Sequence, residues 1–162
     1  MLPWYPAIGY RYASFSGDDA GTKDKNEAWD PLHNGSTAKG FGYWYQGIVV
    51  GTYEGRLTNL NTHYVNLTLA PVVKDMQPVI WMKALYYDHR FNDRSTARLD
   101  GAAVSSDRFA TEWDFMLGYS PTKKVDYMAI YGSAKPGQGG KDRNYGADKV
   151  ETLIQFALMI HF

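Results

Sequence analysis

The last thirteen residues, VETLIQFALMIHF (150–162), alternate between two kinds of side chain up to the final position. One set is almost entirely apolar and consists of Val150, Thr152, Ile154, Phe156, Leu158, Ile160 and Phe162. The other set contains Glu151, Gln155, Ala157 and His161. Because successive side chains of a β-strand point to opposite faces, this pattern predicts a strand with one apolar face. In water another layer of protein must cover such a face, whereas in a membrane the lipid covers it.

The same two-residue period recurs along the chain, and no helical period does. It is clearest in FATEWDFMLGY (109–119), where Trp113, Phe115 and Leu117 alternate with Glu112 and Asp114. The other stretches that read as strands are 6–15, 62–71, 78–90 and 125–134. The sequence therefore predicts one all-β domain over residues 1–162, with about six antiparallel strands.

The connections between these strands alternate in length. Residues 71–78 and 120–124 are short, whereas 17–61, 91–108 and 135–148 are long and polar. Long connections at one end and short turns at the other are typical of outer-membrane barrels. The alternation, together with 13 tyrosines and 15% aromatic residues, predicts an up-and-down transmembrane β-barrel segment in the bacterial outer membrane.

The longest connection contains a second apolar stretch, FGYWYQGIVVGTY (41–53). If this stretch crossed the membrane, one long loop would fall on the side of the short turns. We therefore expect it to lie within the loop and to pack over or into the barrel mouth. The alternative is a seventh strand at 43–53.

Composition excludes several other classes of protein. Seventeen basic and 17 acidic residues cancel, so no basic field favours nucleic acid. The absence of cysteine excludes disulfides and cysteine metal sites. No nucleophile motif or phosphate loop is present, so we expect no enzymatic activity. The acidic loop stretch SGDDAGTKDKNEAWD (16–30) offers weak Ca²⁺ candidates in Asp18, Asp19 and Asp24, and no other cofactor is expected.

The C-terminus resembles the signal that the outer-membrane barrel assembly machinery recognises. A terminal aromatic residue, Phe162, follows apolar residues two, four and six positions earlier, which are Ile160, Leu158 and Phe156. We expect these four residues to serve assembly.

Six stretches carry a wider resemblance. They are PAIGYRYASFSGDD (6–19), YWYQG (43–47), LTNLNTH (57–63), ALYYDHRF (84–91), ATEWDF (110–115) and SAKPG (133–137). In this order and before a terminal Phe, they resemble the C-terminal part of the alginate-export outer-membrane family. The resemblance implies a monomeric barrel of roughly eighteen strands. It also implies that the barrel conducts an anionic polysaccharide or related solutes, with the three long connections outside the cell.

Six strands are too few for a closed barrel with a polar lumen, since about eight is the smallest common bacterial size. The first residues, MLPWYPAIGY (1–10), lack the basic and apolar regions of a signal peptide. We therefore expect a piece of a longer chain, whose remaining N-terminal strands are its partners. The alternative is a small soluble or self-assembling β-barrel that binds a ligand in an aromatic interior. The two readings differ in whether the apolar stripe on the strands is exposed or buried.

In the barrel reading, the polar set of each strand lines the lumen. These candidates are Arg11, Lys83, Glu112, Asp114, Asp126, Glu151, Gln155 and His161. A path for a chain of carboxylates should be basic, because Arg and Lys pair with them. The last three predicted strands are instead mainly acidic. These charges either select solutes or pair across strands and make the wall rigid.

Overall fold

The computed structural model describes most of the six predicted strands and part of the connections. The described residues are 4–19, 21–22, 24–28, 46–51, 58–71, 78–99, 102–143, 146 and 148–162.

Six long strands form one antiparallel sheet in the order β1-β2-β3-β6-β7-β8. Their bounds are β1 Trp4–Phe15, β2 Leu60–Pro71, β3 Val79–Phe91, β6 Arg108–Thr122, β7 Val125–Pro136 and β8 Glu151–Ile160. Each strand pairs with its neighbour in the chain, so the topology is up-and-down, and β1 and β8 lie at opposite edges. The predicted all-β, up-and-down fold is confirmed, and the sheet does not close on itself.

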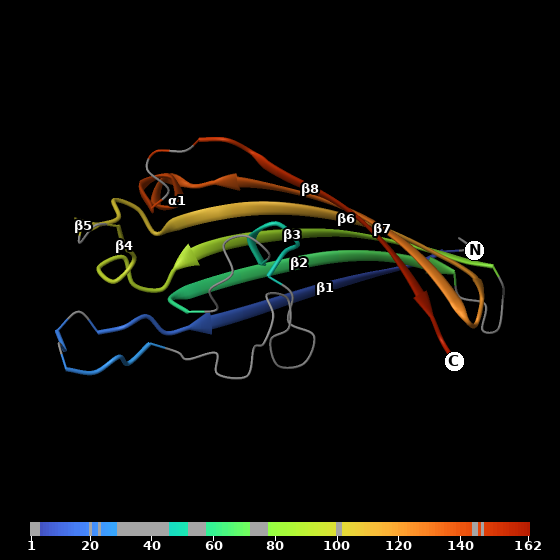
Figure 1. The fold of residues 1–162 in the computed structure, drawn as a ribbon, viewed down its shortest axis with the longest axis horizontal. Helices are drawn as coiled ribbons and strands as arrows, with labels where there is room; N and C mark the ends of the chain where they lie inside the picture. Colours follow the sequence, from blue (N-terminus) through green and yellow to red (C-terminus); the bar gives the residue numbers. More distant parts are fainter. Residues whose placement is uncertain are drawn as a thin grey trace.

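The arched sheet has two different ends, as Figure 1 shows. We call the end that carries the long connections after β1, β3 and β7 the loop end. The other end, the turn end, carries the short connections and both chain termini (Figure 1). The loop end also holds three small elements that the sequence did not predict. They are β4 (Arg98–Leu99), β5 (Ala102–Ala103) and the helix α1 (Gln138–Arg143).

The strand register places the two alternating sets on separate faces. Glu112 of β6 lies opposite Tyr87 of β3 and Ala134 of β7. Trp113, one residue later, lies opposite Tyr86 and Ser133 and points to the other side. We call the face that carries Glu112 the inner face and the face that carries Trp113 the outer face.

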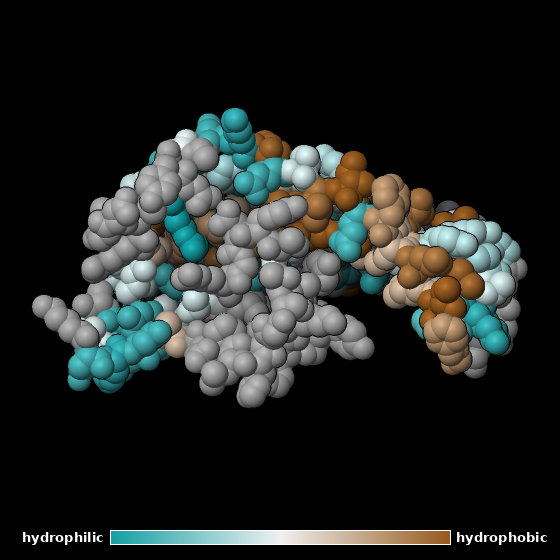
Figure 2. Space-filling view, in the orientation of Figure 1, coloured by the Kyte–Doolittle hydropathy of each residue, from teal (hydrophilic) through white to brown (hydrophobic). Residues whose placement is uncertain are grey.

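The buried core lies on the inner face and towards the loop end. It joins Ile48, Val49 and Val50 to residues of β2, β3, β6, β7 and the connection after β3. Among the described residues no second layer covers the outer face, where many large apolar side chains are exposed. Figure 2 shows hydrophobic side chains gathered over the middle of the sheet, while hydrophilic ones gather over the connection after β1.

The apolar stretch predicted inside the longest connection is described at residues 46–51. There the chain forms one turn, which we call the inner turn, closed by a hydrogen bond from the Gly51 N–H to the Gly47 carbonyl (3.1 Å). All six residues of the inner turn are buried, and none forms a strand. Residues 46–51 therefore lie within the connection and pack against the sheet, whereas 41–45 and 52–53 lie outside the described residues.

Candidate functional site

The eight candidate lining residues all fall on the inner face. Pairing connects their positions from strand to strand; for example, Arg11 lies opposite Tyr64, Tyr64 opposite Tyr87, and Tyr87 opposite Glu112. The same ladder continues through Ala134 to Glu151. The structure thus brings together on one surface residues that lie far apart in the chain. It also separates them into two kinds, covered and accessible.

The covered kind comprises two carboxylates of β6. Glu112 is 0% exposed and Asp114 is 1% exposed. Glu112 accepts the backbone N–H of Val49 through Oε1 (2.6 Å) and that of Val50 through Oε2 (2.8 Å). Asp114 accepts the N–H of Ile48 through Oδ2 (3.0 Å). Three consecutive amides of the inner turn therefore supply both oxygens of Glu112 and one oxygen of Asp114 with the hydrogen bonds that buried polar groups require, while Asp114 Oδ1 accepts none.

Two glycines allow this close approach. Gly47 has a φ of +81°, a backbone conformation that residues other than glycine rarely adopt. A Cβ at this position would lie 2.4 Å from Glu112 Cδ. Gly132 of β7 lies beneath the inner turn, and a Cβ there would lie 2.2 Å from Ile48 Cγ2. The sheet therefore has space for the inner turn at Gly132, and the inner turn has space for the Glu112 carboxylate at Gly47.

A row of aromatic and hydroxyl side chains packs on the inner face of β2 and β3, next to the inner turn. The rings of Tyr87 and His89 stack at 5.7 Å, and those of Tyr64 and Tyr87 lie 5.0 Å apart. Thr62 Oγ1 and His89 Nδ1 are 2.9 Å apart, within hydrogen-bonding distance. Thr62, Tyr87 and His89 are fully buried, so they contribute packing and no accessible surface to the inner face.

The accessible kind includes the remaining six candidates. Arg11, Glu151 and Gln155 are exposed, and Lys83 is partly exposed. The Lys83 Nζ lies 5.6 Å from the centre of the Trp81 ring, a cation–π contact. Asp126 Oδ2 and His161 Nε2 lie 2.7 Å apart at the turn end, within hydrogen-bonding distance. The part of the inner face that the inner turn does not cover therefore carries both positive and negative side chains.

Sequence reasoning placed Glu112 and Asp114 on the correct face but did not foresee that they are covered. The hydrogen-bond donors are backbone amides of Ile48, Val49 and Val50, which no side-chain pattern reveals. The one available signal was Gly132, because a glycine inside a strand often marks a close backbone approach.

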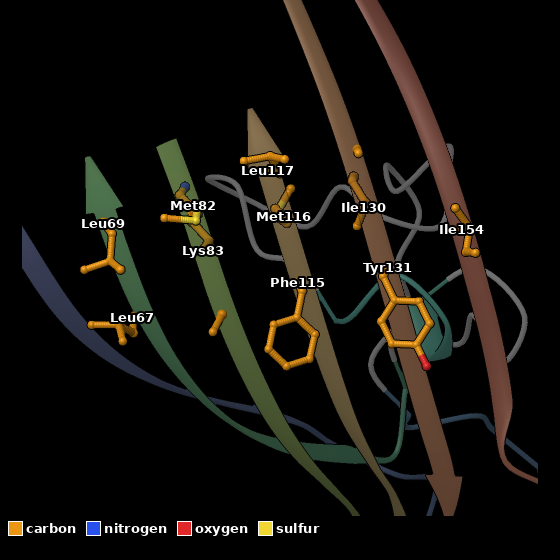
Figure 3. Close-up of a pocket in the computed structure, with 12 residues that line it drawn as sticks. Leu67, Leu69, Met82, Lys83, Phe115, Met116, Leu117, Ile130, Tyr131 and Ile154 are labelled. Atoms are coloured by element: carbon orange, nitrogen blue, oxygen red, sulfur yellow. The ribbon is translucent and has the colours of Figure 1, made fainter. Parts of the chain in front are cut away.

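The outer face carries the apolar stripe that the sequence predicted. Phe115 is 50% exposed and Phe156 is 78% exposed, and Trp113, Leu117, Ile154 and Leu158 are similarly open. A shallow groove of about 490 Å³ crosses this face, where the small side chains of Ala84 and Ala129 lie among larger ones. Figure 3 shows Leu67, Phe115, Tyr131 and Ile154 around it, from four different strands.

The proposed assembly residues share this outer face at the turn end. Phe156, Leu158 and Ile160 are exposed, and Phe162, beyond the end of β8, is fully exposed. The His161 N–H donates to the Lys124 carbonyl (2.9 Å), which fixes the chain just before its last residue.

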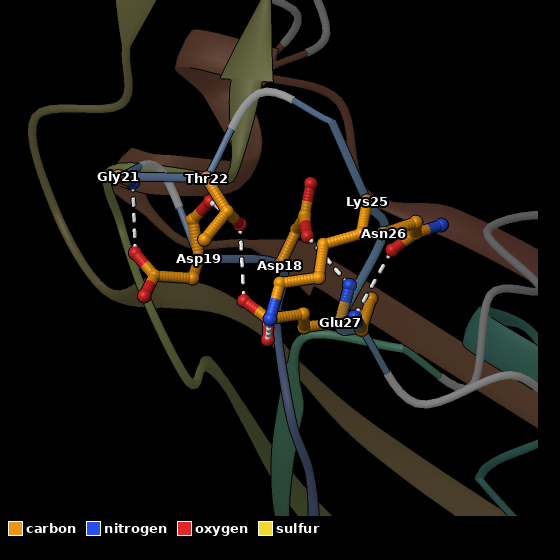
Figure 4. Close-up of polar contacts among 8 residues, drawn as sticks. Asp18, Asp19, Gly21, Thr22, Lys25, Asn26 and Glu27 are labelled. Carbon is orange, nitrogen blue, oxygen red and sulfur yellow. Dashed lines mark hydrogen bonds and ion pairs between the residues drawn. The ribbon is translucent and has the colours of Figure 1, made fainter.

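The acidic connection after β1 uses its own carboxylates as hydrogen-bond acceptors (Figure 4). Asp18 accepts the N–H of Glu27 (2.8 Å), and Asp19 accepts that of Gly21 (2.8 Å). Within the described residues, no group of three His, Asp or Glu side chains could hold a metal ion. The Ca²⁺ candidates Asp18, Asp19 and Asp24 therefore gain no further support.

Comparison with known proteins adds no identification: no family model, curated protein or solved structure matches the chain. No helix in the described part of the chain is long and apolar enough to cross a membrane.

Proposed function

We propose that these strands form the C-terminal wall of an outer-membrane β-barrel channel of the alginate-export type. Such a channel conducts an anionic polysaccharide or related solutes across the bacterial outer membrane. The observation that carries the proposal is the contrast between the two faces of a single sheet. One face exposes large apolar side chains, and the other carries ionisable ones together with a chain segment folded against it. A wall between lipid and an aqueous lumen requires these two faces.

Lipid accounts for the outer face. Burying a Leu or Phe side chain fully stabilises a protein by about 1.5–3 kcal/mol relative to leaving it in water. The outer stripe leaves this stabilisation largely unused unless hydrocarbon covers it. Aromatic pairs also lie towards both ends of the stripe, as girdles at the membrane interfaces do. The Tyr119 and Tyr127 rings are 6.3 Å apart near the turn end, and those of Tyr86 and Trp113 are 4.8 Å apart nearer the loop end.

The sheet edges indicate what else the channel needs. Among the described residues, β1 pairs only with β2, and β8 pairs only with β7. Each unpaired backbone group in lipid costs several kcal/mol, so further strands must cover both edges. Because six alternating strands leave β1 and β8 antiparallel, an even number of added strands closes the barrel. We propose that the N-terminal strands of a longer chain supply them.

The test is reconstitution of the complete barrel that contains these strands. It should require detergent for extraction and should form ion-conducting pores in a planar bilayer, which an added polyuronate partly blocks. A water-soluble, monomeric product that gives no conductance would contradict the proposal. It would instead favour the alternative, a small soluble barrel that binds a ligand in its aromatic interior.

A further inference from the structure

The inner face presents a different charge from the one its residue types suggest. The candidate lining residues include four acidic side chains and two basic ones, Arg11 and Lys83. Two of the acidic ones, Glu112 and Asp114, are covered by the inner turn and have no exposed surface to offer a solute. The remaining acidic pair, Asp126 and Glu151, balances the two basic side chains in number. The wall thus becomes less acidic because of how the chain folds.

The covering is specific and not a general collapse of the loop. Glu112 accepts two backbone N–H groups and Asp114 accepts one, at 2.6–3.0 Å, and the three amides come from successive residues. In the described part of the chain neither carboxylate forms an ion pair, and the backbone donors that they meet are the amides of residues 48–50. Gly47 and Gly132 each leave space that a side chain would fill. A segment that only filled the lumen would need none of these features.

We propose that the inner turn determines charge selectivity by masking Glu112 and Asp114, so that anionic solutes meet Arg11 and Lys83 without two additional negative charges. This inference rests on the proposed channel function. Rings of charge in a pore select ions by sign, so the number of accessible carboxylates matters directly. Release of the inner turn would have two effects at once: it would widen the lumen and expose both carboxylates.

The experiment displaces the inner turn from either side of the contact in the complete barrel. Gly132→Val places methyl groups where Ile48 lies, and Gly47→Val places them against Glu112. The matched control is Ala7→Val in β1, which also adds methyl groups on the inner face but at an exposed position. We expect both displacing variants to raise single-channel conductance. We also expect them to shift the reversal potential in a KCl gradient towards cation selectivity, and the control to do neither.

A second set of variants separates the effect of the two carboxylate charges from the effect of a wider lumen. Adding Glu112→Gln and Asp114→Asn to Gly132→Val should keep the raised conductance and remove the shift in reversal potential. If the shift persists without the two carboxylates, masking is not its cause and the inference is wrong.

Displacement itself is measured with a cysteine probe. The 162 residues contain no cysteine and Val49 is 0% exposed, so Val49→Cys is the only labelling site in a barrel whose other strands are also free of cysteine. A water-soluble maleimide should label it slowly alone and rapidly beside Gly132→Val. Rapid labelling with unchanged selectivity would overturn the masking role and leave the channel proposal intact. Absence of conductance in every variant, the parent included, would contradict the channel proposal itself.

Discussion

Glu112 accepts the backbone N–H of Val49 at 2.6 Å, although 63 positions of sequence separate the two residues. This contact links the longest connection to the middle of the sheet. The neighbouring amide of Val50 binds the second oxygen of the same carboxylate. Both oxygens of Glu112 are therefore acceptors in use, whereas Asp114 uses only one of its two for this turn.

This difference predicts unequal effects of two isosteric amide substitutions. In Glu112→Gln an NH₂ group replaces one acceptor, so one buried N–H loses its partner. The loss should lower the free energy of unfolding by about 1–3 kcal/mol. Asp114→Asn should cost less, because its carbonyl can still face Ile48 while the NH₂ takes the place of Oδ1, which accepts no hydrogen bond. Denaturant titration of both variants checks this order, and a larger cost for Asp114→Asn would contradict it.

Adjacent residues of β8 provide a matched test of sidedness. Ile154 lies on the outer face beside the apolar groove, and Gln155 lies on the inner face opposite Ile130. Ile154→Arg should destabilise the barrel by roughly 2–4 kcal/mol if the site lies near the bilayer midplane. Gln155→Arg should be nearly neutral for stability and should favour anions in the pore. Equal losses of stability in lipid would show that the two positions do not face different media.

The terminal aromatic residue should matter for assembly more than for stability. Phe162 lies beyond the last residue of β8, and no protein atoms cover it. In the proposed barrel the membrane interface buries its side chain only in part, which contributes at most about 1–2 kcal/mol to stability. Deleting it should reduce the amount of barrel inserted in cells far more than it reduces the unfolding free energy of refolded protein. Phe115→Ala, on the outer face of β6 and outside the four proposed assembly residues, should do the reverse. Equal insertion with and without Phe162 would remove the assembly role.

One loop contact should respond to acid. Asp142 of α1 accepts the hydroxyl and the backbone N–H of Ser105 (2.7 Å for the N–H), and also the Gln138 side-chain N–H₂ (2.7 Å). These bonds favour the carboxylate and hold the pKa of Asp142 below its ordinary value of 3.8. A lowered pKa means that the contact is complete above pH 3.8 and is lost as the pH falls through the lowered value.

Amide hydrogen exchange at Ser105 measures this contact. Protection should be constant near neutral pH and should decrease in acid below pH 3.8, after correction for the intrinsic exchange rate. Asp142→Asn should lower protection at neutral pH and remove the acid step. A step of the same size in Asp142→Asn would assign it to another group.

The strands were readable from sequence because the two faces of each meet different surroundings. In β6, Trp113 and Phe115 alternate with Glu112 and Asp114, and the alternation fixed both strand and face. β3 was harder, since Leu85 and Tyr87 make its inner face apolar as well. The structure supplies the reason, because both residues are buried on the inner face.

The remaining features left no periodic signal in the sequence. β4 and β5 have two residues each, and α1 has six, of which Gly139 and Gly140 disfavour a helix on their own. The inner turn binds through backbone amides, which every residue except proline possesses. Its contact with Glu112 depends on tertiary structure that brings residues 48–50 to β6.

Quenching of Trp113 by lipids with brominated acyl chains tests most directly the central claim that the outer face meets lipid and the inner face does not. Trp113 lies on the outer face and Trp81 on the inner face, where its ring packs over Gly118. In the reconstituted barrel, Trp113→Phe should remove a large part of the quenchable fluorescence, whereas Trp81→Phe should leave that part unchanged. Quenching that is absent, or that is lost with Trp81 and not with Trp113, would contradict the account.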